Sequence, residues 1–131
     1  MKFIIDTSIL ADLEKGETAV SKRLLAVTGN LDLSAYNITF VNLFEFLFGI
    51  KLRSPKNQQI ALEFIDKFWV LHTSNETSKI LANLRFKYDK KGIVLSLADF
   101  IIAALAIEND LTLVTRDTDF EKITELKRII I

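Results

Sequence analysis

The sequence predicts an α/β fold, a three-layer α/β/α sandwich in which helices cover both faces of a short, mainly parallel sheet. Short apolar runs alternate along the chain with longer helical segments, which is the order of elements in such folds. The short runs are largely apolar, as expected of strands that are buried on both faces. With 131 residues, half of them hydrophobic, the chain is long enough to bury a large core as one domain, residues 1–131.

The predicted strands are the short apolar runs. KFII is rich in β-branched residues and comes first, and LDLSA alternates between apolar and polar residues. WVLHT and TLVT each follow a helical segment, and RIII comes last. The predicted strands cover residues 2–5, 31–35, 69–73, 112–115 and 128–131.

The predicted helices are marked by apolar periodicity and by residues that begin or end helices. One apolar face ends at Gly29, a typical residue after the last helical turn. Pro55 suits the first helical position, and Ser96 suits the N-cap of an apolar helix. The helices are expected over residues 7–14, 17–29, 39–52, 55–68, 75–90 and 97–110.

Composition excludes several classes of protein. Seventeen basic and seventeen acidic side chains give a net charge near zero, so the chain lacks the overall positive charge of proteins that capture nucleic acid in bulk, and any nucleic-acid activity must come from a local site. The absence of cysteine excludes disulfides and thiolate metal sites and favours a cytoplasmic protein. No apolar run approaches the ~20 residues of a membrane span, and the N-terminus lacks the features of a signal peptide.

Four acidic residues are expected at one edge of the sheet. Asp6 ends the first predicted strand, and Asp117 follows the strand TLVT. Asp99 lies in the first turn of a helix, and Glu45 lies one to two turns into the helix after the second predicted strand. Ligands of open α/β sheets bind beyond the carboxyl ends of the strands, so these side chains are candidates for one pocket.

Each of three aspartates also has a structural explanation. Asp6 could cap the helix that begins at Thr7. Asp99 stands three residues after Ser96, as in a capping box, where it also suits the helix dipole. Asp117 could form a turn. These alternatives stay open for each residue taken singly.

Glu45 has no such explanation. It lies in FVNLFEFLFG, residues 40–49, and no lysine or arginine stands three or four positions away along the helix. An unpaired carboxylate costs several kcal/mol when it leaves water. A divalent cation shared with the other acids would compensate this charge; a subunit interface or a distant arginine is the structural alternative. Hard oxygen ligands without cysteine favour Mg²⁺ or Mn²⁺ over zinc.

Four motifs in this order resemble the PIN-domain nucleases, and more narrowly the VapC-type toxins of toxin–antitoxin pairs. The motifs are FIIDTS, FVNLFEFLFG, LADFIIAALA and LVTRDTDF, and the similarity covers essentially the whole chain. The resemblance implies an acidic quartet of Asp6, Glu45, Asp99 and Asp117 that binds one or two Mg²⁺ or Mn²⁺ ions. Asp119 is a rival or auxiliary to Asp117 as the fourth acid.

The resemblance also assigns expectations to neighbouring residues. Thr7, Ser8 and Thr115 match positions where the family carries hydroxyls that hold an acid or a water. Arg116 is a candidate for contacting substrate phosphate, although a solvated surface arginine is the simpler interpretation. His72, in WVLHT, is expected to be structural.

The implied function is metal-assisted hydrolysis of RNA phosphodiester bonds by an endoribonuclease toxin. The segment from Phe40 to Leu52 is hydrophobic nearly all round, more than one face of a small domain can bury. The resemblance therefore implies a homodimer interface and a groove for a VapB-type antitoxin, whose basic side chain would block the acidic pocket. Two alternatives remain open: an RNA-processing PIN nuclease without an antitoxin, and a non-catalytic metal-binding regulatory module.

Overall fold

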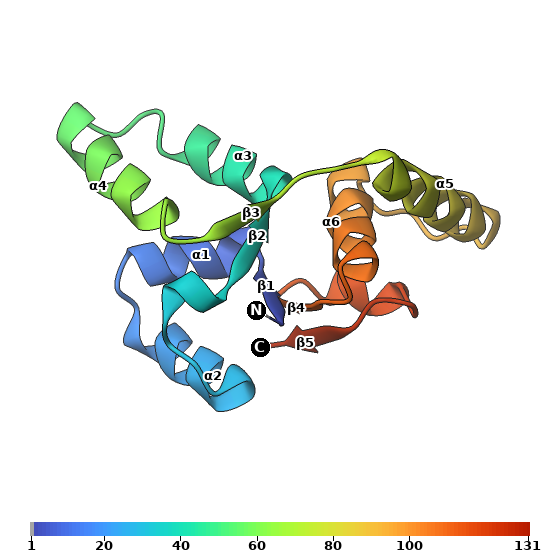
Figure 1. Cartoon of the computed structure of the whole chain (residues 1–131), viewed down its shortest axis with the longest axis horizontal. Coiled ribbons are helices and arrows are strands. Elements are labelled where there is room, and N and C mark those ends of the chain that lie inside the picture. Colours follow the sequence, from blue (N-terminus) through green and yellow to red (C-terminus); the bar gives the residue numbers. More distant parts are fainter. Residues whose placement is uncertain (1) are drawn as a thin grey trace.

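Within residues 2–131, the part of the chain that the computed structural model describes, five parallel strands form one sheet in the order β3-β2-β1-β4-β5. Helices α1 to α4 lie on one side of the sheet, and α5 and α6 lie on the other (Figure 1). The predicted α/β/α sandwich with a short parallel sheet is therefore confirmed. The strands are β1 (Phe3–Ile5), β2 (Asn37–Thr39), β3 (Trp69–Leu71), β4 (Thr112–Thr115) and β5 (Arg128–Ile130). The helices are α1 (Thr7–Glu14), α2 (Thr18–Thr28), α3 (Phe40–Gly49), α4 (Pro55–Ile65), α5 (Asn75–Lys90) and α6 (Leu97–Glu108).

Alternating side chains of the central strands supply two hydrophobic cores. Ile4 of β1 and Leu113 of β4 are fully buried in the core that contains most of the buried residues of α5 and α6. Their successors Ile5 and Val114 point to the other face and join the core formed with α1, α2, α3 and α4. These strands are apolar on both faces because both faces are covered.

One predicted strand is wrong. Residues 31–35 were expected to be a strand, but Leu33–Ala35 form a short 3₁₀ helix, and the strand β2 begins only at Asn37. The reason is local: the Asp32 carboxylate accepts a hydrogen bond from the backbone N–H of Ser34. This bond stabilises a turn, which competes with the hydrogen bonding of a β-strand. The helix expected to reach residue 52 ends at Gly49, and the helix expected over 55–68 ends at Ile65.

The predicted helix ends are confirmed where a capping residue marked them. Gly29 adopts a φ of 75° after α2, a left-handed conformation that favours glycine. Pro55 is the first residue of α4, behind the N-cap Ser54. Ser96 caps α6 through a hydrogen bond from the backbone N–H of Asp99. Among the described residues, none of the helices is both long and apolar enough to cross a membrane.

Parallel pairing places the carboxyl ends of the strands at one edge. The central strand β1 lies between β2 and β4, so the residues that follow these three strands are neighbours. Asp6 follows β1, Thr39 ends β2 and Thr115 ends β4. This edge carries the candidate site.

Candidate metal centre

Asp6 is a buried carboxylate whose two oxygens both accept hydrogen bonds. Its Oδ1 accepts from the backbone N–H of Thr7 at 2.9 Å and from the side-chain amide of Asn42 at 3.1 Å. Its Oδ2 accepts from the hydroxyl of Thr115 at 2.6 Å. Asp6 is also the N-cap of α1, so its capping role is confirmed and coexists with a place in the site. Three donors hold this side chain in one orientation.

Three further aspartates converge beside it. Asp99, in the first turn of α6, and Asp117 and Asp119, after β4, each offer one carboxylate oxygen, and these oxygens lie within 4.8 Å of one another. They range from half-buried to exposed, so solvent and ions reach them. Three hard oxygen donors at such separations fit a Mg²⁺ or Mn²⁺ ion.

The charges of the cluster act on one another. Burial raises the pKa of Asp99, a hydrogen bond with Ser96 lowers it, and the negative charges of Asp117, Asp6 and Asp119 raise it further. The net pKa of Asp99 lies above its ordinary value. The negative charges of Asp117, Asp6 and Asp119 thus disfavour the ionised form of Asp99.

Glu45 does not lie in the environment that its sequence suggested. The apolar neighbours of Glu45 in FVNLFEFLFG predict a carboxylate removed from water, but the side chain is exposed on α3. Its Oε1 accepts a hydrogen bond from the hydroxyl of Thr7 at 2.7 Å. The hydroxyl of Thr7 in turn accepts from Asn42, the residue that also contacts Asp6. The structure thus joins Glu45 to Asp6 through hydrogen bonds, and Glu45 is not among the three clustered aspartates.

Thr115 connects Asp6 to the segment after β4. Its fully buried hydroxyl donates to Asp6 and accepts from the backbone N–H of Asp117 at 3.0 Å. Asp117 accepts from the backbone N–H of Asp119 at 2.9 Å, so it forms the turn that begins a short 3₁₀ helix, residues 118–122. Its predicted turn-forming role is confirmed, while its role toward a metal stays a prediction.

The remaining predicted residues differ in placement. Ser8 is exposed, and its hydroxyl makes no hydrogen bond to any residue in the described range 2–131. Arg116 forms an ion pair with Asp12 of α1 and is neither free in solvent nor extended across the acids. His72 is exposed and stacks on Phe40, with ring centroids 6.5 Å apart.

Asn42 is the site residue that sequence reasoning missed. It is fully buried, and its amide nitrogen lies 3.1 Å from Asp6 Oδ1 and 3.0 Å from Thr7 Oγ1. A signal for it was present: Asn42 stands three residues after Thr39, the spacing of a capping box, and both halves of that box are formed.

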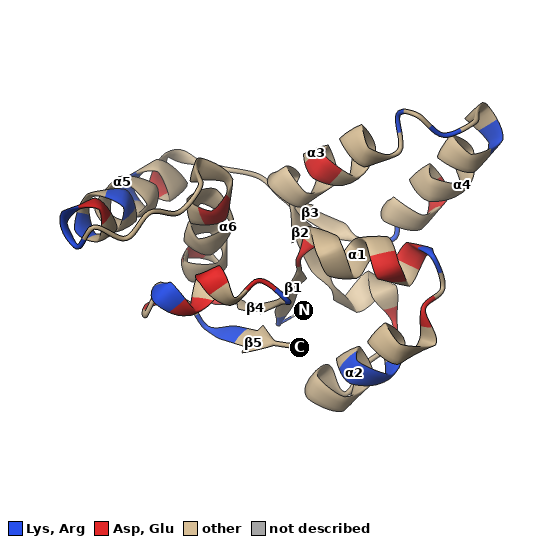
Figure 2. Ribbon diagram, turned by 180° about the vertical axis from the view of Figure 1, so that it is seen from behind, with Lys and Arg blue, Asp and Glu red and all other residues tan. Residues whose placement is uncertain are grey.

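Charge is distributed unevenly around this edge. Acidic segments occur at the end of β1, on α3, on α6 and after β4, whereas the outer end of α5 is rich in lysine (Figure 2).

A groove of about 240 Å³ begins at Thr7 and Glu45 and extends between α1 and α3 to Lys15 and Arg53. A second groove, of about 300 Å³, is apolar and lies along α3; it is lined by Phe40, Leu43, Phe44, Leu47, Phe48 and Lys51.

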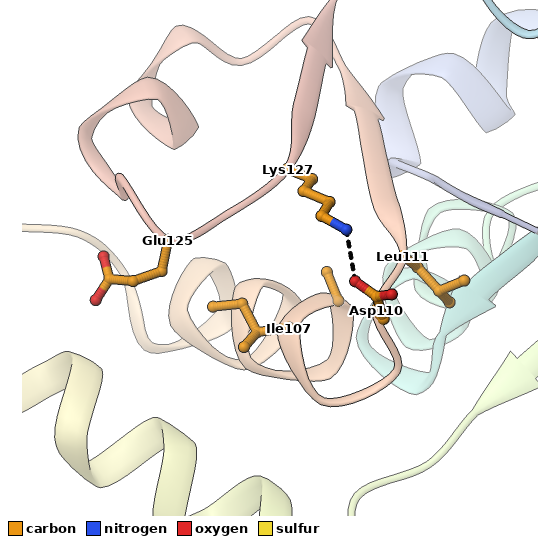
Figure 3. A pocket seen from close by; sticks show the side chains of 6 residues that line it. Ile107, Asp110, Leu111, Glu125 and Lys127 are labelled. Atoms are coloured by element: carbon orange, nitrogen blue, oxygen red, sulfur yellow. Dashed lines mark hydrogen bonds and ion pairs between the residues drawn. The ribbon is translucent and has the colours of Figure 1, made fainter.

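A third, smaller cavity of about 100 Å³ lies at the opposite end of α6 from Asp99 (Figure 3). Its charges are already paired or directed elsewhere: the ammonium of Lys127 contacts Asp110 at 2.6 Å, and the Glu125 carboxylate points away from the Lys127 and Asp110 side chains. It offers no acidic cluster comparable to that at the carboxyl ends of the strands.

The comparisons with known proteins identify the family of the chain and agree with its fold. The model of the PIN domain family matches residues 3–126, so the chain belongs to the PIN domain family. The chain is 29% identical to Ribonuclease VapC2 from Rickettsia felis over 98% of its own length and 92% of that protein.

Several solved structures with a similar fold are those of toxin–antitoxin or VapBC complexes. The chain resembles VapBC2 from Rickettsia felis, bound to a promoter DNA fragment, with a TM-score of 0.83, 22% identity, and coverage of 99% of this chain and 98% of that one. For DNA-bound VapBC from Salmonella typhimurium the TM-score is 0.82 with 23% identity, over 99% and 98% of the two chains. A toxin–antitoxin complex from Klebsiella pneumoniae has a TM-score of 0.73 and 27% identity, over 94% and 93%.

Proposed function

We propose that the protein is a Mg²⁺- or Mn²⁺-dependent endoribonuclease of the VapC type, the toxin of a toxin–antitoxin pair. The observation that carries this proposal is the convergence of Asp99, Asp117 and Asp119 beside the buried, triply hydrogen-bonded Asp6. The relative from Rickettsia felis is named a ribonuclease, and it matches nearly the whole chain. An RNA substrate would place the activity in the cytoplasm.

The acids have different parts in this proposal. Asp6, at the end of a strand, and Asp99, at the start of a helix, would hold the ion directly, with Glu45 and Asp117 completing its surroundings directly or through water. Asp117 is the better candidate for the fourth acid, because Asp119 already pairs with the ammonium of Lys122 at 3.0 Å. Asp119 is then an auxiliary ligand. A bound divalent ion would supply a more acidic water and stabilise charge on the phosphate.

The protein's own residues would keep the acids in place. Thr115 fixes Asp6 relative to the segment of Asp117, and Thr7 fixes Glu45 relative to α1. Ser8 is exposed at the start of α1, where its hydroxyl would be available to a water or to substrate. Arg116 would reach a substrate phosphate only by leaving Asp12, so its contribution to RNA binding is expected to be small.

The partners follow from the exposed apolar surface of α3. Phe44 and Phe48 are 63% and 71% exposed, and they line the 300 Å³ apolar groove. Exposed apolar patches of this kind mark protein interaction sites. We propose that a second copy of the chain and a VapB-type antitoxin together cover this surface. Structures of related toxins in VapBC complexes support such a partner.

The test is RNA cleavage with a matched pair of variants. Purified protein is incubated with a mixed RNA pool in Mg²⁺, in Mn²⁺ or in EDTA, and the ends of the products are mapped. Wild-type protein should cut internally with either metal and not in EDTA. Asp6→Asn and Asp99→Asn should each abolish cutting, since each removes a charge from the cluster and keeps the side chain's shape. Asp66→Asn, at an exposed helix end, is the control and should cut normally.

The same experiment separates the alternatives. Metal binding by calorimetry without any RNA cleavage would favour a non-catalytic metal-binding module. RNA cleavage by the wild-type protein that is not inhibited by any small antitoxin would favour an RNA-processing nuclease. Full activity in Asp99→Asn would reject the site itself.

A further inference from the structure

The orientation of the Asn42 amide is fixed by its neighbours. The backbone N–H of Thr39 can only donate, and it lies 2.9 Å from Asn42 Oδ1, which must therefore be the oxygen. The Thr39 hydroxyl donates to the same oxygen at 2.8 Å. The amide nitrogen, with two hydrogens, consequently faces Asp6 Oδ1 and Thr7 Oγ1.

This orientation decides where the proton of Thr7 goes. The Asn42 amide donates one hydrogen bond to Asp6 and the other to the Thr7 oxygen. A hydroxyl that accepts on one side has its single proton free for another acceptor. That acceptor is Glu45, at 2.7 Å. The chain of hydrogen bonds therefore runs in one direction, from Thr39 through Asn42 and Thr7 to Glu45.

We propose that Asn42 is a positioning residue, which holds Asp6 of β1 and, through Thr7, Glu45 of α3 in fixed relative orientation. Glu45 is exposed, and its contact with Thr7 is what limits its side chain's freedom on this side of α3. Without the Asn42 amide, the Thr7 hydroxyl can turn to Asp6 and release Glu45. This inference rests on the proposed metal-dependent function, because positioned carboxylates matter for holding a cation.

The first test measures Mn²⁺ affinity directly by calorimetry. Residues that orient metal ligands typically change affinity by about 10–100-fold when removed. Asn42→Ala is expected to weaken Mn²⁺ binding by at least about tenfold on that basis. The matched control is Thr77→Ala, because Thr77 is likewise a buried third-position residue of a capping box, in α5. Both variants lose a helix cap, but only Asn42→Ala should lose metal affinity.

The second test asks whether Asn42 acts on Glu45. A double-mutant cycle combines Asn42→Ala with Glu45→Gln and again measures Mn²⁺ affinity. If Asn42 holds Glu45 in place, the loss in the double variant is smaller than the product of the two single losses. Independent, multiplicative losses would overturn the proposal. If Asn42→Ala does not fold, Asn42→Ser replaces it in the cycle, since a serine hydroxyl has one hydrogen and cannot donate to both Asp6 and Thr7, and it adds no charge beside Asp6.

The outcomes distinguish this inference from the proposed function. Wild-type protein that binds Mn²⁺ but cuts no RNA rejects the nuclease, and the affinity measurements still decide the role of Asn42. Wild-type protein that cuts RNA while Asn42→Ala binds Mn²⁺ as Thr77→Ala does rejects the inference alone. Wild-type protein that binds no Mn²⁺ rejects both.

Discussion

Thr115 is the residue whose loss should weaken the fold and the site together. Thr115→Val keeps the shape of a buried side chain but removes one hydroxyl. Two interactions disappear: the 2.6 Å hydrogen bond to the Asp6 carboxylate and the 3.0 Å hydrogen bond from the Asp117 backbone. The variant leaves a buried carboxylate oxygen without its donor, which is the costly way to lose a hydrogen bond.

The expected loss of stability follows from these two contacts. A hydrogen bond to a charged group contributes about 1.5–3 kcal/mol, and a bond between neutral groups about 0.5–1.5 kcal/mol. The free energy of unfolding should therefore fall by about 2–4.5 kcal/mol. With about 3–5 °C per kcal/mol for a domain of this size, the melting temperature should fall by roughly 10 °C.

Urea unfolding followed by circular dichroism measures this loss. The midpoint should fall while the slope with urea stays constant, since the exposed surface does not change. Thr112→Val in the same strand is the control, because among the described residues the Thr112 side chain has no hydrogen-bond partner. Thr115→Ser should recover most of the loss. Equal midpoints for Thr115→Val and Thr112→Val would refute the reasoning.

Two further predictions concern charged residues. Asp99→Asn should stabilise the metal-free protein at pH 7 by about 1 kcal/mol, because carboxylate oxygens of Asp117 and Asp119 lie within 4.8 Å of one on Asp99, and two like charges at that limit repel by roughly 0.9 kcal/mol in a water-like dielectric. Because the pKa of Asp99 is raised, this advantage of Asp99→Asn shrinks as the pH falls through that pKa toward 3.8. Calorimetry in EDTA at pH 7 and pH 4 measures the melting temperatures of the variant and the wild type. A variant melting temperature at pH 7 that is equal to or below that of the wild type would contradict the repulsion. Burial raises the pKa of Glu125, but hydrogen bonds from Tyr88, its own backbone and Lys87 outweigh burial and hold that pKa at about 2. The resulting stabilisation is complete above the ordinary glutamate pKa of 4.5 and is lost as the pH falls through about 2. Glu125→Gln should therefore destabilise the protein at pH 7 and have little effect near pH 2, as measured by urea unfolding. An equal effect at both pH values would contradict this prediction.

The sequence predicted the fold because its signals are local. Runs such as FIIDTS and TLVT are apolar enough to be strands, and Gly29, Pro55 and Ser96 mark helix ends by their own conformational preferences. The positions of Asp6 and Asp117 at the edge of the sheet followed from parallel topology alone. The strand expected over 31–35 failed because the Asp32 side chain stabilises a turn, which the apolar-polar alternation does not reveal.

The details of the site depended on packing that sequence does not display. Glu45 was expected in an apolar environment because its neighbours along the chain are apolar, but the exposed face of α3 is itself partly apolar, as Phe44 and Phe48 show. The ion pair of Arg116 with Asp12 joins residues from separate elements. Asn42 carries no charge, so its residue type does not mark it as a metal ligand, and its role as a hydrogen-bond donor to Asp6 and Thr7 depends on the fold.

The hydrogen bond between Asp6 and Thr115 also determines when, during synthesis, the site can assemble. These two residues are 109 positions apart, so a ribosome that adds about 5–20 residues per second needs roughly 5–20 s to make the second after the first. During that interval the nascent chain lacks β4 and the aspartates that follow it. Under the proposed function, the growing polypeptide has no assembled active site while it is held beside ribosomal RNA. It acquires one only when its synthesis is nearly finished.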